Sequence, residues 1–287
     1  MKLNKLKKSR RRKDLVLSSL IWMSAAFTIG SLLWITWYVL YNGLKHVNWA
    51  FISDNYTRTG DEHGIYPMIV STVYMVIASV SVAVPISIMT AIYLTEFAKA
   101  GSRVVRLTRF CIEALAGIPS IIFGLFGMTF FVAALGFGFS ILSGALTLSL
   151  LILPVIIRTT EEALIAVPDS YREGSYGLGA SKIHTIWRLI LPSAVPGILT
   201  SVILSIGRII GESAPVFLTA GMVAQIPTSI LDSGRTLTVH LYKLTTELFT
   251  VEQWDQAYGT ATVLIVIVLM INVLTRIIAK YFNIATY

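Results

Sequence analysis

Long uncharged stretches alternate with short polar segments along this chain. Five stretches contain no Asp, Glu, Lys or Arg: 15–44, 65–95, 114–157, 189–207 and 257–275. A helix needs about 20 consecutive apolar residues to cross the hydrocarbon core of a bilayer. The third stretch is 44 residues long, which is enough for two crossings, and a Gly-Phe-Gly run at 136–138 supplies a turn. The pattern therefore predicts an all-α bundle that spans a membrane six times.

The polar segments between these stretches set the expected boundaries. We expect a basic tail over residues 1–14, a first transmembrane helix over 15–41 and a core over 65–276. A polar segment, 158–188, separates the fourth span from the fifth. Within the core, the predicted spans are 67–95, 114–135, 139–157, 189–211 and 257–276.

The composition supports a membrane protein. Of the 287 residues, 55% are hydrophobic and 13% are charged, and the mean hydropathy is +0.75. An ordinary soluble domain carries about 25% charged residues. The single cysteine, Cys111, excludes an internal disulfide and a cysteine-based zinc site.

The positive charges indicate which ends of the spans face the cytoplasm. The 23 Lys and Arg exceed the 15 Asp and Glu, which gives a net charge of +8. Cytoplasmic segments of membrane proteins carry the excess of Lys and Arg. With both termini in the cytoplasm, 18 of the 23 fall on that side. We therefore interpret the charge as a topology signal whose tail also contacts anionic membrane lipid, rather than as a nucleic-acid site. A cleaved signal peptide is disfavoured, because its apolar core would be about 7 to 15 residues long.

The polar segment 158–188 has its own helix signals. Ser170-Tyr171-Arg172-Glu173 reads as a capping box, which predicts a short helix with Ser170 as its N-cap. Gly177 and Gly179 predict a break after that helix, and Ser181 or Lys182 can start a second one. The segment is therefore too organised for a plain linker.

The same segment resembles a known family pattern. Glu173-Gly174-Ser175, three residues, Gly179, nine residues and then Leu-Ile-Leu-Pro at 189–192 is similar to the EAA loop of ABC importer permeases. The two alanines of that pattern are replaced here by Gly174 and Ser175, which are also small. The resemblance implies a type I ABC importer permease in which Glu173, Gly174, Ser175 and Gly179 contact a separate ATPase. An ordinary loop with a surface helix is the alternative.

Two charged residues interrupt an otherwise apolar stretch. Arg208 and Glu212 lie four residues apart, which places them on one face of a helix. An ionisable residue at such a position is a candidate functional site. In one interpretation Arg208 offers a cation to a passing anion, and Glu212 keeps that anion from binding too tightly. In the other interpretation, Arg208 and Glu212 form a local ion pair whose charged ends extend to the outer membrane–water interface.

Arg158 and a face formed by Ser120 and Gly124 are further candidates for the pathway. Arg158, at the inner end of the fourth span, is either a positive-inside anchor or a contact for the cargo on exit. Ser120 and Gly124 form a small-residue face, which either lines the pathway or allows close helix packing.

Two local sequences resemble the A-type subunit of phosphate-specific ABC permeases. These are residues 207–220, around Gly-Glu-Ser-Ala-Pro, and residues 115–127, around Ala-Gly-Ile-Pro-Ser. The resemblance implies phosphate as cargo and a bacterial or archaeal cell membrane as location. It also implies a C-type permease subunit, two copies of a cytoplasmic ATPase and an external phosphate-binding protein as partners. A C-type subunit, or a permease for sulfate or molybdate, stays open as an alternative.

Importing an anion into a cell that is negative inside needs an energy source, at about 2.3 kcal/mol per charge per 100 mV. The chain has no phosphate-binding loop of the Gly-Lys type, so we expect it to bind no cofactor, with ATP and Mg on the partner ATPase. An intramembrane enzyme is a rival hypothesis, but Gly211-Glu212-Ser213-Ala214-Pro215 lacks the last glycine of a nucleophile elbow. A proton-coupled carrier is a further rival hypothesis, and its transport would continue after ATP depletion.

Overall fold

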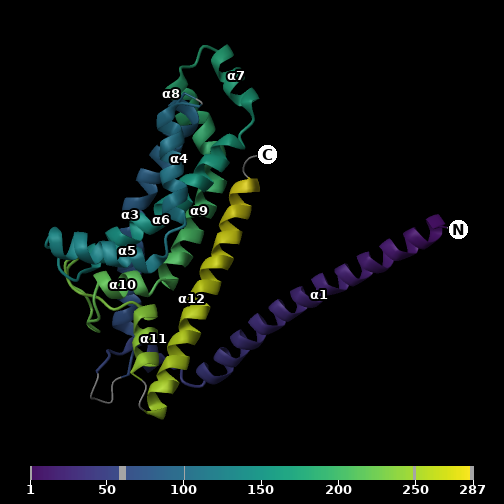
Figure 1. Cartoon of the computed structure of the whole chain (residues 1–287). Helices are drawn as coiled ribbons and strands as arrows, with labels where there is room; N and C mark the ends of the chain where they lie inside the picture. The colour runs from purple at the N-terminus through teal and green to yellow at the C-terminus, as the bar shows by residue number, and fades with distance from the viewer. Residues whose placement is uncertain (1, 58–62, 100, 248–249, 285–287) are drawn as a thin grey trace.

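The computed structural model describes residues 2–57, 63–99, 101–247 and 250–284 (Figure 1). In these residues the regular elements are helices, apart from an isolated bridge between Tyr56 and His63. The α-helices are α1 (Lys2–Gly43), α2 (Trp49–Ser53), α3 (Tyr66–Ile92), α4 (Arg103–Ala116), α5 (Ser120–Gly127), α6 (Ile141–Ile165), α7 (Asp169–Gly177), α8 (Lys182–Thr185), α9 (Leu191–Gly211), α10 (Ala214–Thr219), α11 (Leu237–Thr246) and α12 (Val251–Ile284). Three π-helical segments extend them: η1 (Tyr93–Phe97), η2 (Met128–Ala134) and η3 (Ile186–Ile190).

Five helical segments of the described chain are long and apolar enough to cross a membrane. They are Asp14–Gly43, Tyr66–Phe97, Ile141–Ile165, Lys182–Gly211 and Val251–Leu274. A sixth crossing results if Arg103–Ala116 and Ser120–Ala134, which meet at a bend of 101°, count as one broken span. The all-α, multi-span fold class is therefore confirmed.

The bend is the main difference from the sequence expectation, which placed one straight span over 114–135. The helix stops at Gly117, and Pro119 follows in an extended conformation before α5 begins. A proline disfavours the helical conformation of the residue before it, which explains the break at Ile118. The turn expected at 136–138 is present, since Gly136 and Gly138 have φ of 70° and 64°.

Helices α3, α6 and α9 pack together as the centre of the bundle. Small and hydroxyl side chains allow α3 and α6 to approach closely, and the Ser149 hydroxyl donates to the Ser79 carbonyl at 3.0 Å. A Cβ on Gly144 would press against Met75 and Ala220. Close approach through small residues is how helices associate in lipid.

Helix α1 leaves the bundle along most of its length (Figure 1). Near its C-terminal end it packs on α12, where the Tyr38 and Tyr258 rings meet edge-on at 6.0 Å and Thr262 donates to the Val39 carbonyl at 3.3 Å. Closer to the N-terminus of α1, large apolar side chains such as Trp22 and Phe27 are exposed in this chain. Their cover must come from lipid or from another chain.

The two ends of the bundle differ in what they carry. Helices α7 and α8 form one end, and the last turns of α12 run back toward it, whereas α11 lies near the opposite end (Figure 1). Helices α5 and α10 lie across the bundle between these ends (Figure 1). The α7–α8 end is therefore separated by the length of a span from the end that carries α11.

Candidate functional site

The structure joins Arg208 and Glu212 as an ion pair at the end of α9. Arg208 Nε lies 3.5 Å from Glu212 Oε1, and the side chains are 40% and 16% exposed. Arg208 belongs to the last turn of α9, while Glu212 follows the helix in an extended conformation. The pair therefore sits where the helix stops, and the guanidinium keeps an accessible side.

Polar contacts hold the backbone around this pair. The Thr238 hydroxyl of α11 donates to the Glu212 carbonyl at 2.9 Å, which supplies a partner just beyond the helix end. Helix α10 begins two residues after Glu212 with Pro215 in its first turn. Because α11 lies beyond the end of α9, toward the end of the bundle opposite α7 (Figure 1), the pair does not lie at the tip of the bundle.

Ser120 is connected to the Arg208–Glu212 pair by the packing of α5 on α10 and not by a direct hydrogen bond. It is the first residue of α5, and a Cβ at Gly124, one turn later, would press against Pro215 and Leu218 of α10. Among the described hydrogen bonds, none joins Ser120 to Arg208 or Glu212. The small-residue face of α5 thus packs on α10.

Arg158 lies far from Arg208. Helix α6 starts beside α10, where the Ser140 amide donates to the Thr219 carbonyl at 3.1 Å, and Arg158 follows 18 residues later. At 1.5 Å per residue this is about 27 Å along the helix. The structure therefore does not bring Arg158 into one site with the Arg208–Glu212 pair.

Arg158 belongs instead to a charged cluster at the C-terminal part of α6. It pairs with Glu162 at 3.5 Å, and both side chains are exposed. Beside it, Arg109 of α4 pairs with the mostly buried Glu161 at 3.1 Å. These groups line a cavity of about 220 Å³ between α4 and α6. No local spacing in the sequence links α4 to Arg158.

The helix expected after Pro168 is present, but the predicted capping box is wrong. Helix α7 begins at Asp169, directly after Pro168, and its N-terminus has no side-chain cap. Ser170 is already inside the first turn, so its hydroxyl cannot serve as N-cap. Asp169 provides a negative charge in that turn, which suits the positive end of a helix.

The second half of this segment follows the sequence expectation. Helix α7 ends at Gly177, and Gly179 has φ of +84°, which favours glycine. Ser181 caps α8 by accepting the His184 amide at 3.3 Å. The break and the second helix are therefore confirmed.

The four residues of the EAA-like pattern have different surroundings. Glu173 and Gly174 are exposed, and no described atom lies within 4 Å of a Cβ placed on Gly174 or Gly179. The Ser175 hydroxyl shares a hydrogen bond of 2.8 Å with the Thr185 hydroxyl of α8. The nine residues of α7, all of them described, include none that is buried. Helix α7 thus offers an open face while Ser175 fixes its position on α8.

Sequence reasoning missed the group that anchors α7 to the spans. Arg172 Nη2 and Nε donate to Glu96 Oε1 of η1 at 2.7 and 3.2 Å, and the two side chains are 16% and 7% exposed. The same guanidinium donates to the carbonyls of Leu164 and Val167 at 3.0 and 2.9 Å. One side chain therefore joins the ends of α3 and α6 to the start of α7. The available signal was Glu96 itself, the first charge after the second apolar stretch.

The histidines do not gather at one place in the described chain. His46 pairs with Asp255 at 3.3 Å and His63 with Glu252 at 3.0 Å, while His184 lies in α8 and His240 in α11. Within the residues that the structure describes, no group of three His, Cys, Asp or Glu could hold a metal ion.

Several membrane-spanning helices around a tight core, with an organised helical segment between two spans, define a multi-span helical membrane protein. Residues 83–285 match the family model described as binding-protein-dependent transport system inner membrane component, and the chain belongs to this family.

Sequence relatives cover nearly the whole chain. Phosphate transport system permease protein PstA 1 of Mycobacterium tuberculosis (strain H37Rv) is 35% identical, over 94% of this chain and 88% of its own length. Probable ABC transporter permease protein YqgI of Bacillus subtilis (strain 168) is 30% identical, over 93% of this chain and 95% of its own length.

Solved structures share the fold. A chain of the bacterial alginate ABC transporter in complex with an alginate pentasaccharide-bound periplasmic protein has a TM-score of 0.61 and 16% identity, over 90% of this chain and 96% of that one. A chain of the MetNI methionine ABC transporter has a TM-score of 0.59 and 17% identity, over 76% of this chain and 94% of that one. The expected fold of a type I ABC importer permease is confirmed.

Proposed function

We propose that this chain is the A-type permease subunit of an ATP-driven importer that moves inorganic phosphate into the cell. The observation that carries the proposal is the Arg208–Glu212 pair, held at the end of α9 within the segment that resembles phosphate permeases. The relatives named for phosphate transport favour phosphate over sulfate or molybdate, and the A-type over the C-type subunit. The chain itself is a transport subunit and not an enzyme.

The geometry of the pair suits transient binding of an anion. A guanidinium offers paired donors that match a tetrahedral oxyanion. At 3.5 Å, with Arg208 40% exposed, the bond to Glu212 is loose enough to be exchanged for a phosphate oxygen. Glu212 then competes for the same cation, which prevents the anion from being held too tightly to leave. Ser120 of α5 and Arg158 of α6 are proposed as further contacts along the path.

The open face of α7 supports docking of an ATPase. Glu173, Gly174, Ser175 and Gly179 form this contact in the proposal, with the exposed Glu173 meeting a positive group of the partner. Arg172 then transmits displacement of α7 to α3 and α6 through its bonds to Glu96 and the two carbonyls. The ATPase binds the ATP and Mg, so this chain needs no cofactor of its own.

The complete importer contains more chains than this one. We infer a heterodimer with a C-type permease, two copies of the ATPase on the α7–α8 face and an external phosphate-binding protein on the α11 face. The location is the cytoplasmic membrane of a bacterium or archaeon, with both termini inside. The 18 to 5 distribution of Lys and Arg supports this orientation.

Phosphate uptake by the Arg208→Ala variant tests the proposal. In proteoliposomes with loaded binding protein, uptake should be lost while all four kinds of subunit still copurify. Lys45→Ala, which removes an exposed cation next to α1, is the matched control and should transport normally. Normal uptake by Arg208→Ala would show that the pair is only structural. Stimulation of ATP hydrolysis by sulfate-loaded binding protein alone would refute phosphate as the cargo.

A further inference from the structure

An apolar groove lies on the surface of the two spanning helices α3 and α6. It has a volume of about 590 Å³, and the loop at 228–230 closes one side of it. Among its described lining residues none is charged, and most are apolar, including Ile77, Ala78, Val82, Leu142, Leu146 and Ile230. Both helices are long and apolar enough to cross a membrane, so the groove lies at membrane depth.

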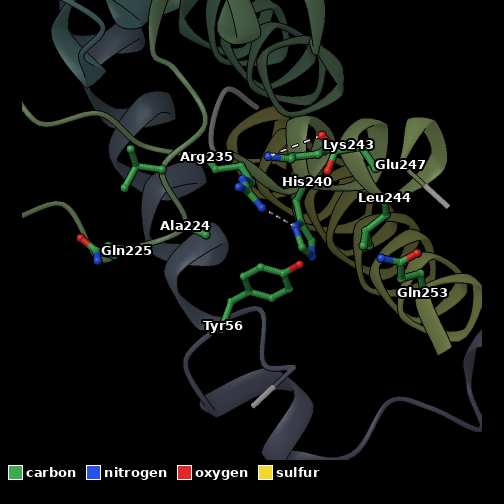
Figure 2. Close-up of a pocket in the computed structure, with 10 residues that line it drawn as sticks. Tyr56, Ala224, Gln225, Arg235, His240, Lys243, Leu244, Glu247 and Gln253 are labelled. Atoms are coloured by element: carbon green, nitrogen blue, oxygen red, sulfur yellow. Dashed lines mark hydrogen bonds and ion pairs between the residues drawn. The ribbon is translucent and has the colours of Figure 1, made fainter. Parts of the chain in front are cut away.

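The groove differs in character from the cavity beside α11. That cavity, of about 260 Å³, is lined by polar and charged side chains such as Tyr56, Arg235, His240 and Lys243 (Figure 2). Burial, together with the nearby charges of Arg235 and Lys243, lowers the pKa of His240 from 6.5 to about 3. The groove on α3 and α6 offers no such groups, so an ion would lose its hydration there without gaining partners. The ligand that fills the groove must therefore be largely apolar.

A small floor residue and a fixed loop shape the groove before any ligand enters. Ala145 of α6 is 1% exposed and lines the groove without filling it. The Asp232 carboxylate accepts the Thr228 amide at 2.8 Å, which holds the loop in a turn. The Ile230 carbonyl accepts the Leu142 amide at 2.9 Å, which ties this loop to the first turn of α6. A ligand therefore meets a formed groove and does not have to order the loop.

The polar groups that can still bind a ligand lie at one end of the groove. Thr228 lines this end beside the start of α6. A Cβ on Gly144 would press against Met75, so the start of α6 is level with the neighbouring Tyr74 of α3. In the described part of the chain the Tyr74 hydroxyl makes no hydrogen bond, and it remains available as a donor. Val82 lies eight residues further along α3, which is about 12 Å.

The dimensions of the groove suit a hydrocarbon chain and not a helix. Toward Val82 the lining is apolar apart from Ser81, whose hydroxyl already donates to the Ile77 carbonyl at 2.7 Å. Divided over about 12 Å of helix, the volume of about 590 Å³ gives a cross-section of about 50 Å². A helix with its side chains is about 10 Å across, or about 80 Å² in section, so a helix cannot enter. One leaflet of the hydrocarbon core is about 15 Å thick, close to the length of the groove.

We propose that this groove binds an acyl chain of a membrane phospholipid. The chain lies along α3 from Tyr74 toward Val82, and the Tyr74 hydroxyl donates to an ester oxygen at the polar end. The groove is continuous with the apolar face of α3, where Val73 and Ile77 are 47% and 59% exposed, so a chain can enter from the bilayer. The bound chain supplies van der Waals contacts that an empty groove would lack. Binding of this kind requires only the spanning fold, whichever cargo the permease moves.

Photo-crosslinking tests the groove. The membrane complex that contains this chain is purified in detergent and titrated with phosphatidylglycerol whose acyl chain carries a diazirine, and labelled peptides are quantified by mass spectrometry. Labelling of residues 74–82 should saturate as the probe concentration rises. Labelling of the exposed face of α12 at 269–274 should instead rise in proportion to the probe, as expected for non-specific contact.

Three variants locate the bound chain. Ala78→Phe fills the groove, so labelling of 74–82 should fall to the proportional background. Tyr74→Phe changes only one hydroxyl of an exposed side chain, and it should weaken saturable labelling by about 2- to 10-fold, the loss expected for one neutral hydrogen bond. Val73→Phe adds a ring on the same helix outside the groove, and this matched control should label like the parent.

The outcomes decide the proposal independently of phosphate uptake. If labelling of 74–82 rises only in proportion to the probe, as at α12, the lipid site is refuted. If 74–82 is labelled less than α12 in the parent, another protein chain covers the groove and the proposal is refuted. If saturable labelling is the same in Ala78→Phe and Tyr74→Phe as in the parent, the lipid lies elsewhere on α3 and the groove is not its site.

Discussion

Replacement of Arg172 by alanine should uncouple ATP hydrolysis from transport. The guanidinium of Arg172 connects α7 with Glu96 of η1 and with the carbonyls of Leu164 and Val167 at the end of α6. In Arg172→Ala these bonds are lost, and α7 remains attached mainly through the Ser175–Thr185 bond. In the proposed importer, an ATPase docked on α7 would then move α7 without moving the spans.

The size of the effect follows from the burial of the ion pair. Glu96 is 7% exposed, so Arg172→Ala leaves a buried carboxylate without its cation. Removing one partner of a buried pair costs about 3 to 5 kcal/mol of stability. Glu96→Gln keeps the shape and an acceptor for Arg172, and should cost about 1 to 2 kcal/mol. Coupling through such a joint is about 1 to 3 kcal/mol, which corresponds to a loss of roughly 5- to 150-fold in phosphate imported per ATP.

The assay measures uptake, ATP hydrolysis and thermal unfolding of the same reconstituted complexes. Asp169→Asn is the matched control. It removes the ion pair between Arg172 Nη1 and Asp169 Oδ1 at 3.2 Å, and the Asp169 side chain is 85% exposed. An exposed pair contributes about 0 to 1 kcal/mol, so this variant should behave like the parent. If Arg172→Ala lowers stability but keeps the parent's ratio of uptake to hydrolysis, the joint is structural and the coupling argument is refuted.

Two further predictions concern packing and pH. Gly127→Ala places a Cβ against Thr147 and Thr219, so it should lower the free energy of unfolding by about 1 to 3 kcal/mol in thermal or denaturant unfolding, whereas Gly207→Ala, with no described atom within 4 Å, should not. The pKa of His240 is about 3 in the folded protein and 6.5 in its ordinary state. Between pH 6.5 and pH 3 the unfolded chain therefore binds more protons than the folded one. The free energy of unfolding should fall by up to about 1.4 kcal/mol per pH unit as the pH drops through this window. His240→Gln should flatten the pH dependence of the unfolding temperature and the exposed His184→Gln should not; equal slopes in all three proteins would contradict the assignment.

The apolar pattern predicted the spanning helices because a segment that crosses lipid has few alternatives to a helix. A backbone in hydrocarbon must satisfy its own hydrogen bonds, so an uncharged stretch of sufficient length has few alternatives to a helix. The same reasoning could not predict the bend of 101° between α4 and α5, since a broken and a straight helix have the same hydrophobic length. Pro119 was visible in the sequence, but its effect depends on whether neighbouring helices stabilise the straight or the bent form.

The candidate site was predictable only where its residues are neighbours in the chain. Arg208 and Glu212 are four residues apart, and the structure joins them as the spacing indicates. Glu96 and Arg172 are separated by 76 residues, and no local spacing rule connects them. Ser170 failed as a cap because α7 begins at Asp169, directly after Pro168, so Ser170 already lies inside the first turn.

The partners of the three arginines determine what each can do. Arg172 is held by a buried carboxylate at 2.7 Å, so its charge is balanced within the protein and it serves as a joint. Arg208 has a carboxylate at 3.5 Å and is 40% exposed, so a passing anion can replace that contact. Arg235 is buried and donates to the Met222 carbonyl, which orients its guanidinium. The exposure of an arginine and the distance to its partner therefore separate the fixed joint at Arg172 from the exchangeable pair at Arg208.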